Sequence, residues 1–398
     1  MDIGFGEAVL LFGALLAVVA ALSGLMRGTV LSASVLSVAV GIFLAAIGVV
    51  HVDPRDDSIV ELVELALILT LFSDGMFVER ELLRRHWSPV ARALVIAMPI
   101  TMALLALAAK ILFPALGWAE AFLLGAVLAP TDPVVTSAVV TSRIVPSAVR
   151  HTLNLESGLN DGLALPFVLF FLVLASPGGD AGAEAAKLAG EALFGAAVGI
   201  GLGIAGGRLH HHLPGGGITA RYEGIYAIGF ALAAFGLADV TIGNGLIAAF
   251  VCGIAMGAAE HDVPAGFVEF AENVSAITQV LTFFVFGALI VATGFDHSIP
   301  PLVVFVGFAL LIARPVAVAL SLFRTGLPQS ERAFMAWFGP KGVASMLFAL
   351  FVLKSSVGSG ELIFDIAAIA ILTSIVAHGL TDTVGARWLA RQVGFEQR

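Results

Sequence analysis

The chain has 398 residues, of which 59% are hydrophobic and only 12% are charged, and its mean hydropathy is +1.02. Soluble domains carry about twice that charged fraction, so the composition excludes an ordinary soluble protein and indicates a membrane protein. The net charge of −9 argues against a nucleic-acid partner, and the single cysteine, Cys252, excludes a disulfide within the chain.

Apolar segments follow one another along the whole chain. A membrane-spanning helix needs about 20 apolar residues, and thirteen segments qualify. In chain order they are 6–26, 29–50, 59–78, 90–114, 118–142, 148–175, 187–207, 222–239, 243–258, 272–294, 299–322, 331–354 and 361–384. The acidic start of the chain is unlike a signal peptide. We therefore predict an all-α polytopic membrane protein that forms a single integral membrane domain over residues 1–398 and is surrounded by membrane lipids.

The basic residues are distributed unevenly between the two sides of these spans. With the N-terminus outside, fourteen Lys and Arg residues fall on the cytoplasmic side and four on the outer side, while Arg314 and Lys341 lie inside spans. Lys and Arg collect on the cytoplasmic side of membrane proteins. The sequence therefore predicts an external N-terminus and a cytoplasmic C-terminus in a bacterial-type cytoplasmic (inner) membrane.

Four charged residues share one depth in four different spans. Asp132, Asp161, Arg314 and Lys341 each lie nine to eleven residues from the cytoplasmic arginine that borders their span. At about 1.5 Å per helical residue this is roughly 13–17 Å, close to half of the ~30 Å hydrocarbon core. Each intramembrane charge costs at least about 2.5–3.5 kcal/mol. We therefore expect these four residues to be paired or functional at the membrane midplane, rather than unrelated structural charges.

Two of these charges lie at predicted helix breaks. The fifth span contains APTDP (129–133) and the twelfth contains GPKG (339–342). Proline removes a backbone donor and clashes with the preceding turn, so both helices should be interrupted at mid-membrane. Asp132 is expected to neutralise the facing N-terminal helix ends and Lys341 the facing C-terminal ends.

The matching positions of the breaks predict an internal repeat. Interrupted spans at corresponding places in two halves indicate the binding site of a transporter. The breaks fall in the fifth of spans one to six and in the fifth of spans eight to thirteen. We therefore predict inverted repeats over about 6–175 and 222–384, linked by the span at 187–207.

The sixth span begins with a polar stretch, ESGLND (156–161). Glu156 and Asn160 are four residues apart and share one helix face, as do Ser157 and Asp161. Arg314 has no acid in its own span, so it should meet one from another helix, and Glu156 is the candidate. Such a buried pair is structural, because removing one partner strands the other charge at a cost of about 3–5 kcal/mol.

Asp161 then has no permanent cation partner. A buried carboxylate of this kind either takes a proton or binds a cation. Its oxygen, the Ser157 hydroxyl and the hydroxyl or freed carbonyl of Thr131 would suit a small hard cation such as Na⁺. Asn160 is neutral and is expected to hold the break in the fifth span or Asp161 itself. Competition at one carboxylate predicts electroneutral, one-for-one exchange of a cation for H⁺.

These motifs resemble those of the monovalent cation/proton antiporters, in the branch of bacterial sodium/proton antiporters related to animal sodium/proton exchangers. The resemblance rests on LFSDGM, LAPTDP, ESGLNDG, ARP and GPKGVAS, and it covers nearly the whole chain. It implies a thirteen-span inverted repeat, a homodimer and a core domain that slides against a dimerisation domain.

The resemblance also implies roles for individual residues. Asp161 would be the ion carrier with Ser157 and Thr131 nearby, and the Asn–Asp pair at the end of ESGLND is typical of electroneutral members. Lys341 stands where arginine is common in the family, so the positive charge is kept but the paired N–H donors of a guanidinium are lost. The long cytoplasmic tail of the animal exchangers is absent, so regulation through such a tail is not expected.

The sequence leaves alternatives to sodium/proton exchange. Potassium/proton exchange on the same fold is the main alternative, and a cation channel is a remote one. An intramembrane aspartyl protease would use Asp132 and Asp161, but its YD and GxGD patterns are absent, so we expect no enzyme and no cofactor. Asp74, near the inner end of the third span, is a candidate to line the entrance to the ion site. His210, His211 and His212 are expected in a solvated cytoplasmic loop.

Overall fold

The computed structural model describes residues 5–26, 32–54, 56–82, 87–132, 144–177, 181–212, 218–259, 265–294 and 298–394. Within these ranges the regular structure is helical and no strand occurs. The elements are α1 (Phe5–Met26), α2 (Ala33–Ala46), α3 (Asp57–Leu82), α4 (Trp87–Arg92), η1 (Ala93–Ala97), α5 (Met98–Leu112), α6 (Trp118–Val127), α8 (Ser147–Ala175), α9 (Ala181–His212), α10 (Ala220–Asp239), α11 (Gly245–Ala259), α12 (Ala265–Thr293), α13 (Ile299–Phe308), η3 (Ala309–Ala313), α14 (Arg314–Ser321), α15 (Gln329–Trp337), α16 (Val343–Lys354) and α17 (Gly360–Gln392).

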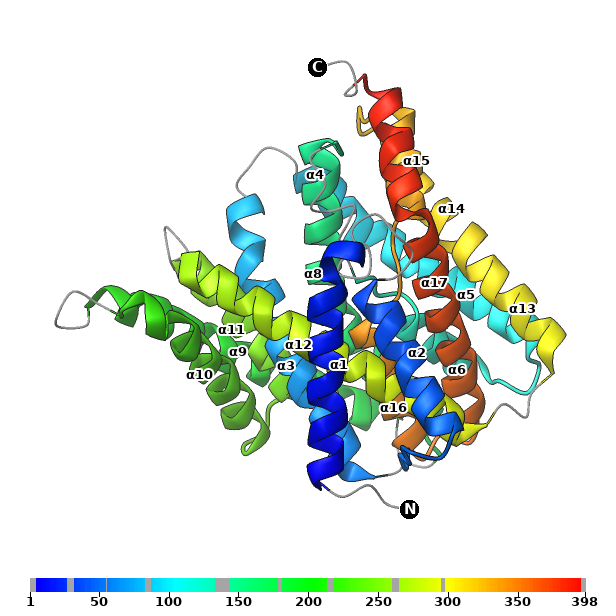
Figure 1. Ribbon diagram of the computed structural model, residues 1–398, viewed down its shortest axis with the longest axis horizontal. Helices are drawn as coiled ribbons and strands as arrows, with labels where there is room; N and C mark the ends of the chain where they lie inside the picture. The colour runs from blue at the N-terminus through cyan, green and yellow to red at the C-terminus, as the bar shows by residue number, and fades with distance from the viewer. Residues whose placement is uncertain are drawn as a thin grey trace.

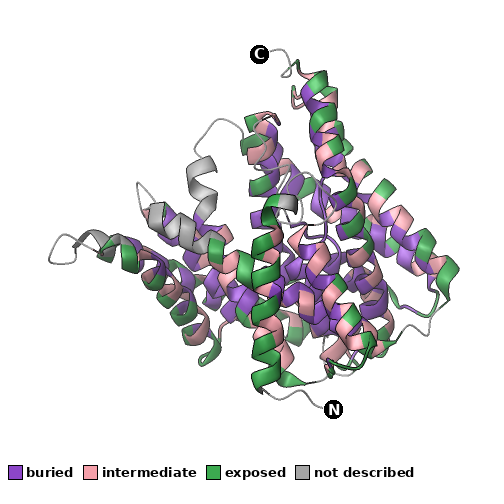
Figure 2. Ribbon diagram, viewed as in Figure 1, coloured by how far each residue is buried: buried purple, intermediate pink, exposed green. Residues whose placement is uncertain are grey.

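These helices fall on the thirteen predicted spans in order, so the predicted all-α polytopic membrane protein is confirmed. Seven of the described helical segments are long and apolar enough to cross a membrane by themselves. The remaining spans are shorter or interrupted, or, in α3 and α10, long but less apolar or more charged. In Figure 1, α9 and α10 lie on one side of the molecule and α13 and α14 on the other, with α8 between them. Buried residues concentrate where the helices meet in the middle, whereas α1 is largely exposed (Figure 2).

Several helix ends differ from the prediction. The helix α9 (Ala181–His212) is longer than the predicted 187–207, so the run from His210 to His212 is helical, and its placement in a loop was wrong. Histidine does not break a helix, and the proline that does follows only at position 214. The side chains of this histidine run lie outside the described part of the chain.

Two helix crossings rely on glycine. A Cβ on Gly41 of α2 would lie 2.1 Å from the Phe284 carbonyl oxygen of α12, and a Cβ on Gly253 of α11 would lie 2.1 Å from the Phe72 carbonyl oxygen of α3. Small residues let membrane helices approach this closely. The first crossing joins span two to span ten, and the second joins span nine to span three. If spans 1–6 repeat in spans 8–13, span two corresponds to span nine and span three to span ten. The two crossings are then equivalent, as a repeat predicts.

A second correspondence lies in the fourth span of each half. The stretches ALVIAMP (93–99) and ALLIARP (309–315) both contain a π-helical segment, η1 and η3. Pro99 and Pro315, two residues after these segments, lack the N–H that continues an α-helix, so the helix widens locally. Arg314 lies directly after the second segment. The repeat boundaries themselves, 6–175 and 222–384, stay a prediction.

Candidate functional site

The twelfth span is interrupted where the sequence predicted. The helix α15 ends at Trp337 and α16 begins at Val343, and the residues between them are not helical. Lys341 lies inside this break and is 4% exposed. The break therefore places free backbone groups and a buried ammonium in the middle of the helix bundle.

The fifth span is interrupted as well. The helix α6 ends at Val127, and residues 128–132 continue without helical structure. Thr131 and Asp132 are buried there. Residues 133–143, including Pro133, lie outside the described part of the chain, so the structure gives the first side of this break only.

The two breaks cross and satisfy each other's backbone groups. The backbone N–H of Asp132 donates to the Pro340 carbonyl at 2.8 Å, and the Asp132 carboxylate accepts a long 3.4 Å bond from the N–H of Val343, the first residue of α16. The Lys341 ammonium donates to the carbonyls of Pro130 at 3.2 Å and Ala129 at 3.5 Å, just past the C-terminal end of α6. The carboxylate thus meets the positive end of one half-helix and the ammonium the negative end of another.

Two glycines of the twelfth span allow close approaches, Gly342 to the break of the fifth span and Gly339 to α14. A Cβ on Gly342 would lie 2.0 Å from the Cβ of Asp132, and a Cβ on Gly339 would lie 1.9 Å from Nε of Arg314. Neither position has room for a side chain while its neighbour stays in place. GPKG is therefore a packing requirement as well as a helix breaker.

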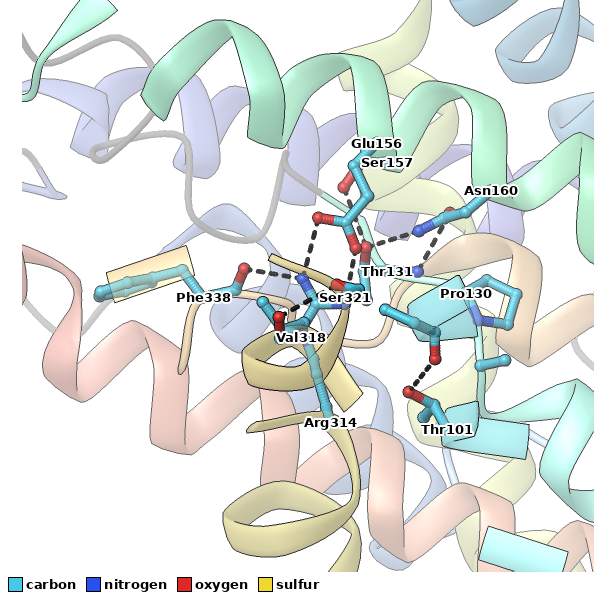
Figure 3. Close-up of polar contacts among 12 residues, drawn as sticks. Thr101, Pro130, Thr131, Glu156, Ser157, Asn160, Arg314, Val318, Ser321 and Phe338 are labelled. Atoms are coloured by element: carbon cyan, nitrogen blue, oxygen red, sulfur yellow. Dashed lines mark hydrogen bonds and ion pairs between the residues drawn. The ribbon is translucent and has the colours of Figure 1, made fainter. Parts of the chain in front are cut away.

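The expected ion pair between Glu156 and Arg314 is present. Nη1 of Arg314 donates to one Glu156 oxygen at 2.8 Å and Nη2 to the other at 3.2 Å. Nη2 also donates to the Phe338 carbonyl in the break of the twelfth span at 3.3 Å. Figure 3 shows α8 above and α14 below, with this pair between them. Since both side chains are buried, Arg314 ties α8 to the break.

Asn160 holds the break in the fifth span, which is one of the two positions expected for it. Its Oδ1 accepts from the backbone N–H of Thr131 at 3.2 Å, and its Nδ2 donates to the Thr131 hydroxyl at 2.7 Å. The Ser157 hydroxyl lies 3.1 Å from the same Thr131 oxygen. Figure 3 shows Ser157 and Asn160 of α8 converging on Thr131. Thr131, Ser157 and Asn160, three of the four residues predicted at the cation site, therefore form one polar cluster.

Asp161 differs from the other buried charges. Its side chain is 5% exposed, and within the described residues its Oδ1 has no hydrogen-bond partner. Asp74, Asp132 and Lys341 lie close enough to act on it electrostatically. Asp74 is partly exposed, and its Cβ lies 3.2 Å from the place of a Cβ on Gly158, one helical turn before Asp161. The site is therefore rich in carboxylates, with one buried oxygen left for a ligand.

Sequence reasoning missed two residues of α17 that contact the break of the twelfth span. The Ser374 hydroxyl accepts from the backbone N–H of Lys341 at 3.0 Å, and His378 contacts Trp337. The signal was a serine and a histidine four residues apart in an otherwise apolar span. Within the described residues, no group of three or more His, Cys, Asp or Glu side chains is arranged to hold a metal ion. A transported cation would instead rely on hydroxyl and carbonyl oxygens beside one carboxylate.

Two interrupted helices that cross beside a buried carboxylate are typical of the binding sites of secondary transporters. The model of the family "Sodium/hydrogen exchanger, transmembrane" matches residues 13–386, and the chain belongs to this family.

The curated relatives carry the names of antiporters for two cations. The K⁺/H⁺ antiporter NhaP of Alkalimonas amylolytica is 28% identical over 83% of this chain, and the Na⁺/H⁺ antiporter 2 of Zygosaccharomyces rouxii is 27% identical over 83%. The chain spans 57% of the length of the first and 45% of the second. Two structures of the sodium proton antiporter MjNhaP1 from Methanocaldococcus jannaschii are similar in fold. The one at pH 8 has a TM-score of 0.75 at 21% identity, and the electron-microscopy one 0.78 at 20%. They cover 96% and 98% of this chain, and 98% of the antiporter chain in each case.

Proposed function

We propose that this chain is a secondary antiporter that exchanges one monovalent cation for one proton, with both competing for the Asp161 carboxylate. The observation that carries the proposal is the contrast between Asp161 and the other buried charges. Glu156 has Arg314, while Asp132 and Lys341 are bound to helix ends and backbone groups. Asp161 alone among these residues has a buried oxygen without a hydrogen-bond partner in the described structure.

The charge of the site favours electroneutral exchange. Asn160 is neutral and is committed to Thr131 by two hydrogen bonds, so one carboxylate remains to be discharged in each direction. Loading it with either a proton or a monovalent cation gives the same net charge. We propose a homodimer in the inner membrane with the N-terminus outside and a role in pH homeostasis.

Na⁺ is the cation we propose first, and K⁺ is the second candidate. The hydroxyls of Thr131 and Ser157 are 3.1 Å apart and supply hard oxygen ligands beside Asp161, which suit a small cation. The name of the Alkalimonas relative favours K⁺. Proton flux driven by Na⁺, Li⁺ or K⁺ in proteoliposomes distinguishes them, because the preferred ion gives the highest rate at subsaturating concentration.

Asp161→Asn tests the proposal directly. The variant should fold and lose exchange with every cation, since its amide neither releases a proton nor balances a cation. Asp239→Asn, at the exposed end of α10, is the matched acid-to-amide control and should retain exchange. Retained exchange in Asp161→Asn would overturn the proposed carrier. A rate that follows an imposed membrane potential would overturn electroneutrality.

A further inference from the structure

His378 of α17 is a buried titratable residue that the proposed exchange does not use. Its Nε2 lies 2.9 Å from the carbonyl oxygen of Trp337, the last residue of α15, and its ring stacks on the Trp337 indole with centroids 5.2 Å apart. The carbonyls at the end of a helix have no partner within the helix. His378 supplies one where water is scarce, since its side chain is only 2% exposed.

Ser374 lies one turn before His378 on the same face of α17 and contacts the other end of the break. Its Oγ accepts from the backbone N–H of Lys341 at 3.0 Å and lies 3.2 Å from Nδ1 of His378. An unpaired backbone donor or acceptor in hydrocarbon costs several kcal/mol. Two adjacent side chains of one helix therefore satisfy both margins of the interruption in another helix.

These contacts form one chain. The N–H of Lys341 donates to the Ser374 hydroxyl, which lies 3.2 Å from Nδ1 of His378, and Nε2 of His378 lies 2.9 Å from the Trp337 carbonyl. A hydrogen on Nε2 makes this nitrogen the donor to that carbonyl. Nδ1 also lies 2.7 Å from the Ser374 carbonyl, which a ring protonated on both nitrogens would serve. That ring would add a third positive charge beside Arg314 and Lys341, which both act on it electrostatically. We assign a hydrogen to Nε2, which donates to the Trp337 carbonyl whether or not Nδ1 also carries one.

The first half of the chain uses a similar arrangement. There Asn160, on the helix that follows the break, accepts from the backbone N–H of Thr131 inside the break. In the second half the next span after the interrupted one is α17, and its Ser374 accepts from the backbone N–H of Lys341. Each break is thus held by the next helix. In the first half that helix also carries Asp161, whereas the polar pair in the second half contacts the break alone.

From this geometry we infer that Ser374 and His378 are positioning residues that fix the break of the twelfth span and so hold the Lys341 ammonium on the carbonyls of Ala129 and Pro130. The inference rests on the proposed function only for its transport readout. Without the pair, the Lys341 backbone loses its anchor, and the C-terminal end of α6 loses the cation that faces it.

The first test is a double-variant cycle for exchange in proteoliposomes. His378→Leu should slow exchange about tenfold, the usual size of one lost buried hydrogen bond, and His378→Gln should recover most of the rate because its amide donates to the Trp337 carbonyl. If His378 acts through Lys341, His378→Leu combined with Lys341→Met should be no slower than Lys341→Met alone. Gln279→Leu, which removes another buried hydrogen bond, to Ser34, is the control whose effect should multiply with that of Lys341→Met.

The second test does not need transport. Deuterium uptake by the backbone amides of 338–343 should rise about tenfold in His378→Leu and Ser374→Ala, and uptake by 128–132 should rise with it because Lys341 is displaced. Gln279→Leu should change neither. Unchanged uptake in both breaks, or multiplying effects of His378→Leu and Lys341→Met, would overturn the inference. A wild-type protein without exchange would instead reject the proposed function, while the uptake experiment would still decide this one.

Discussion

Removing one partner of the Glu156–Arg314 pair should destabilise the protein far more than removing both. The two hydrogen bonds are 2.8 and 3.2 Å long, and the side chains are 5% and 9% exposed. At an effective dielectric constant of about 20, unit charges about 3 Å apart attract by roughly 5 kcal/mol. Stranding one member of a buried pair costs about 3–5 kcal/mol, whereas replacing both is often nearly neutral.

The two single variants should not be equal. Glu156→Gln leaves a buried guanidinium that cannot lose its proton and whose acceptors, the Phe338 carbonyl and the new amide oxygen, are both neutral. Arg314→Gln leaves a carboxylic acid that can neutralise itself with a proton. We therefore expect Glu156→Gln to lower the free energy of unfolding more than Arg314→Gln, and the double variant to lose less than the sum.

The measurement is the free energy of unfolding of the four proteins in mixed detergent micelles, with exchange measured in parallel. Gly339→Ala perturbs the same guanidinium without changing charge, because its Cβ would lie 1.9 Å from Nε of Arg314. Single-variant losses below about 1 kcal/mol, or losses that simply add, would refute a structural ion pair. A stable Arg314→Gln protein without exchange would assign the arginine to transport.

Two further predictions concern Gly342 and Asp57. Gly342→Ala should impair exchange and stability, because a Cβ there would lie 2.0 Å from the Cβ of Asp132. Gly358→Ala is the control and should be neutral, because nothing lies within 4 Å of its Cβ position. Equal melting temperatures and exchange rates of the two variants would contradict this. Asp57 is the first residue of α3, before the predicted span, and the Lys354 ammonium that donates to its carboxylate lowers the pKa of Asp57. The ion pair with Lys354 therefore stabilises the fold fully above the pKa of Asp57 in the unfolded chain, about 3.9, and this stabilisation is lost as the pH falls through the lower pKa of the folded protein. Asp57→Asn should therefore reduce the melting temperature slightly at neutral pH and low salt but not in strong acid, and a reduction in strong acid alone would reverse the assignment.

The breaks and the buried ion pair could be predicted because their physics is local. Proline removes a backbone donor wherever it stands, and a charge in hydrocarbon needs a partner whatever the fold, so APTDP, GPKG, Glu156 and Arg314 were informative without coordinates. The common depth of the charges stays a prediction, which rests on counting residues along helices of constant rise.

The residues that hold the break of the twelfth span were not predictable in the same way. Ser374 and His378 lie about thirty residues after Lys341, and a serine or histidine in an apolar span gives no indication of which backbone group it meets. The ends of α9 were misplaced because hydropathy marks only the apolar part of a helix. The helix itself continues beyond that part until a residue such as proline stops it. The π segments were missed because widening of one turn leaves the apolar pattern nearly unchanged.

The way the two breaks are joined limits how the proposed exchange can proceed. The backbone N–H of Asp132 donates to the Pro340 carbonyl, and the Lys341 ammonium donates to the carbonyls of Ala129 and Pro130. Separating the two breaks would therefore leave backbone groups of both without hydrogen-bond partners. Each exposed group would cost several kcal/mol in the membrane. Arg314 adds a tie between α8 and the Phe338 carbonyl. Alternating access should therefore carry α8, the two breaks and Asp161 together as one body past their neighbours, and a cross-link between the two breaks should leave exchange intact.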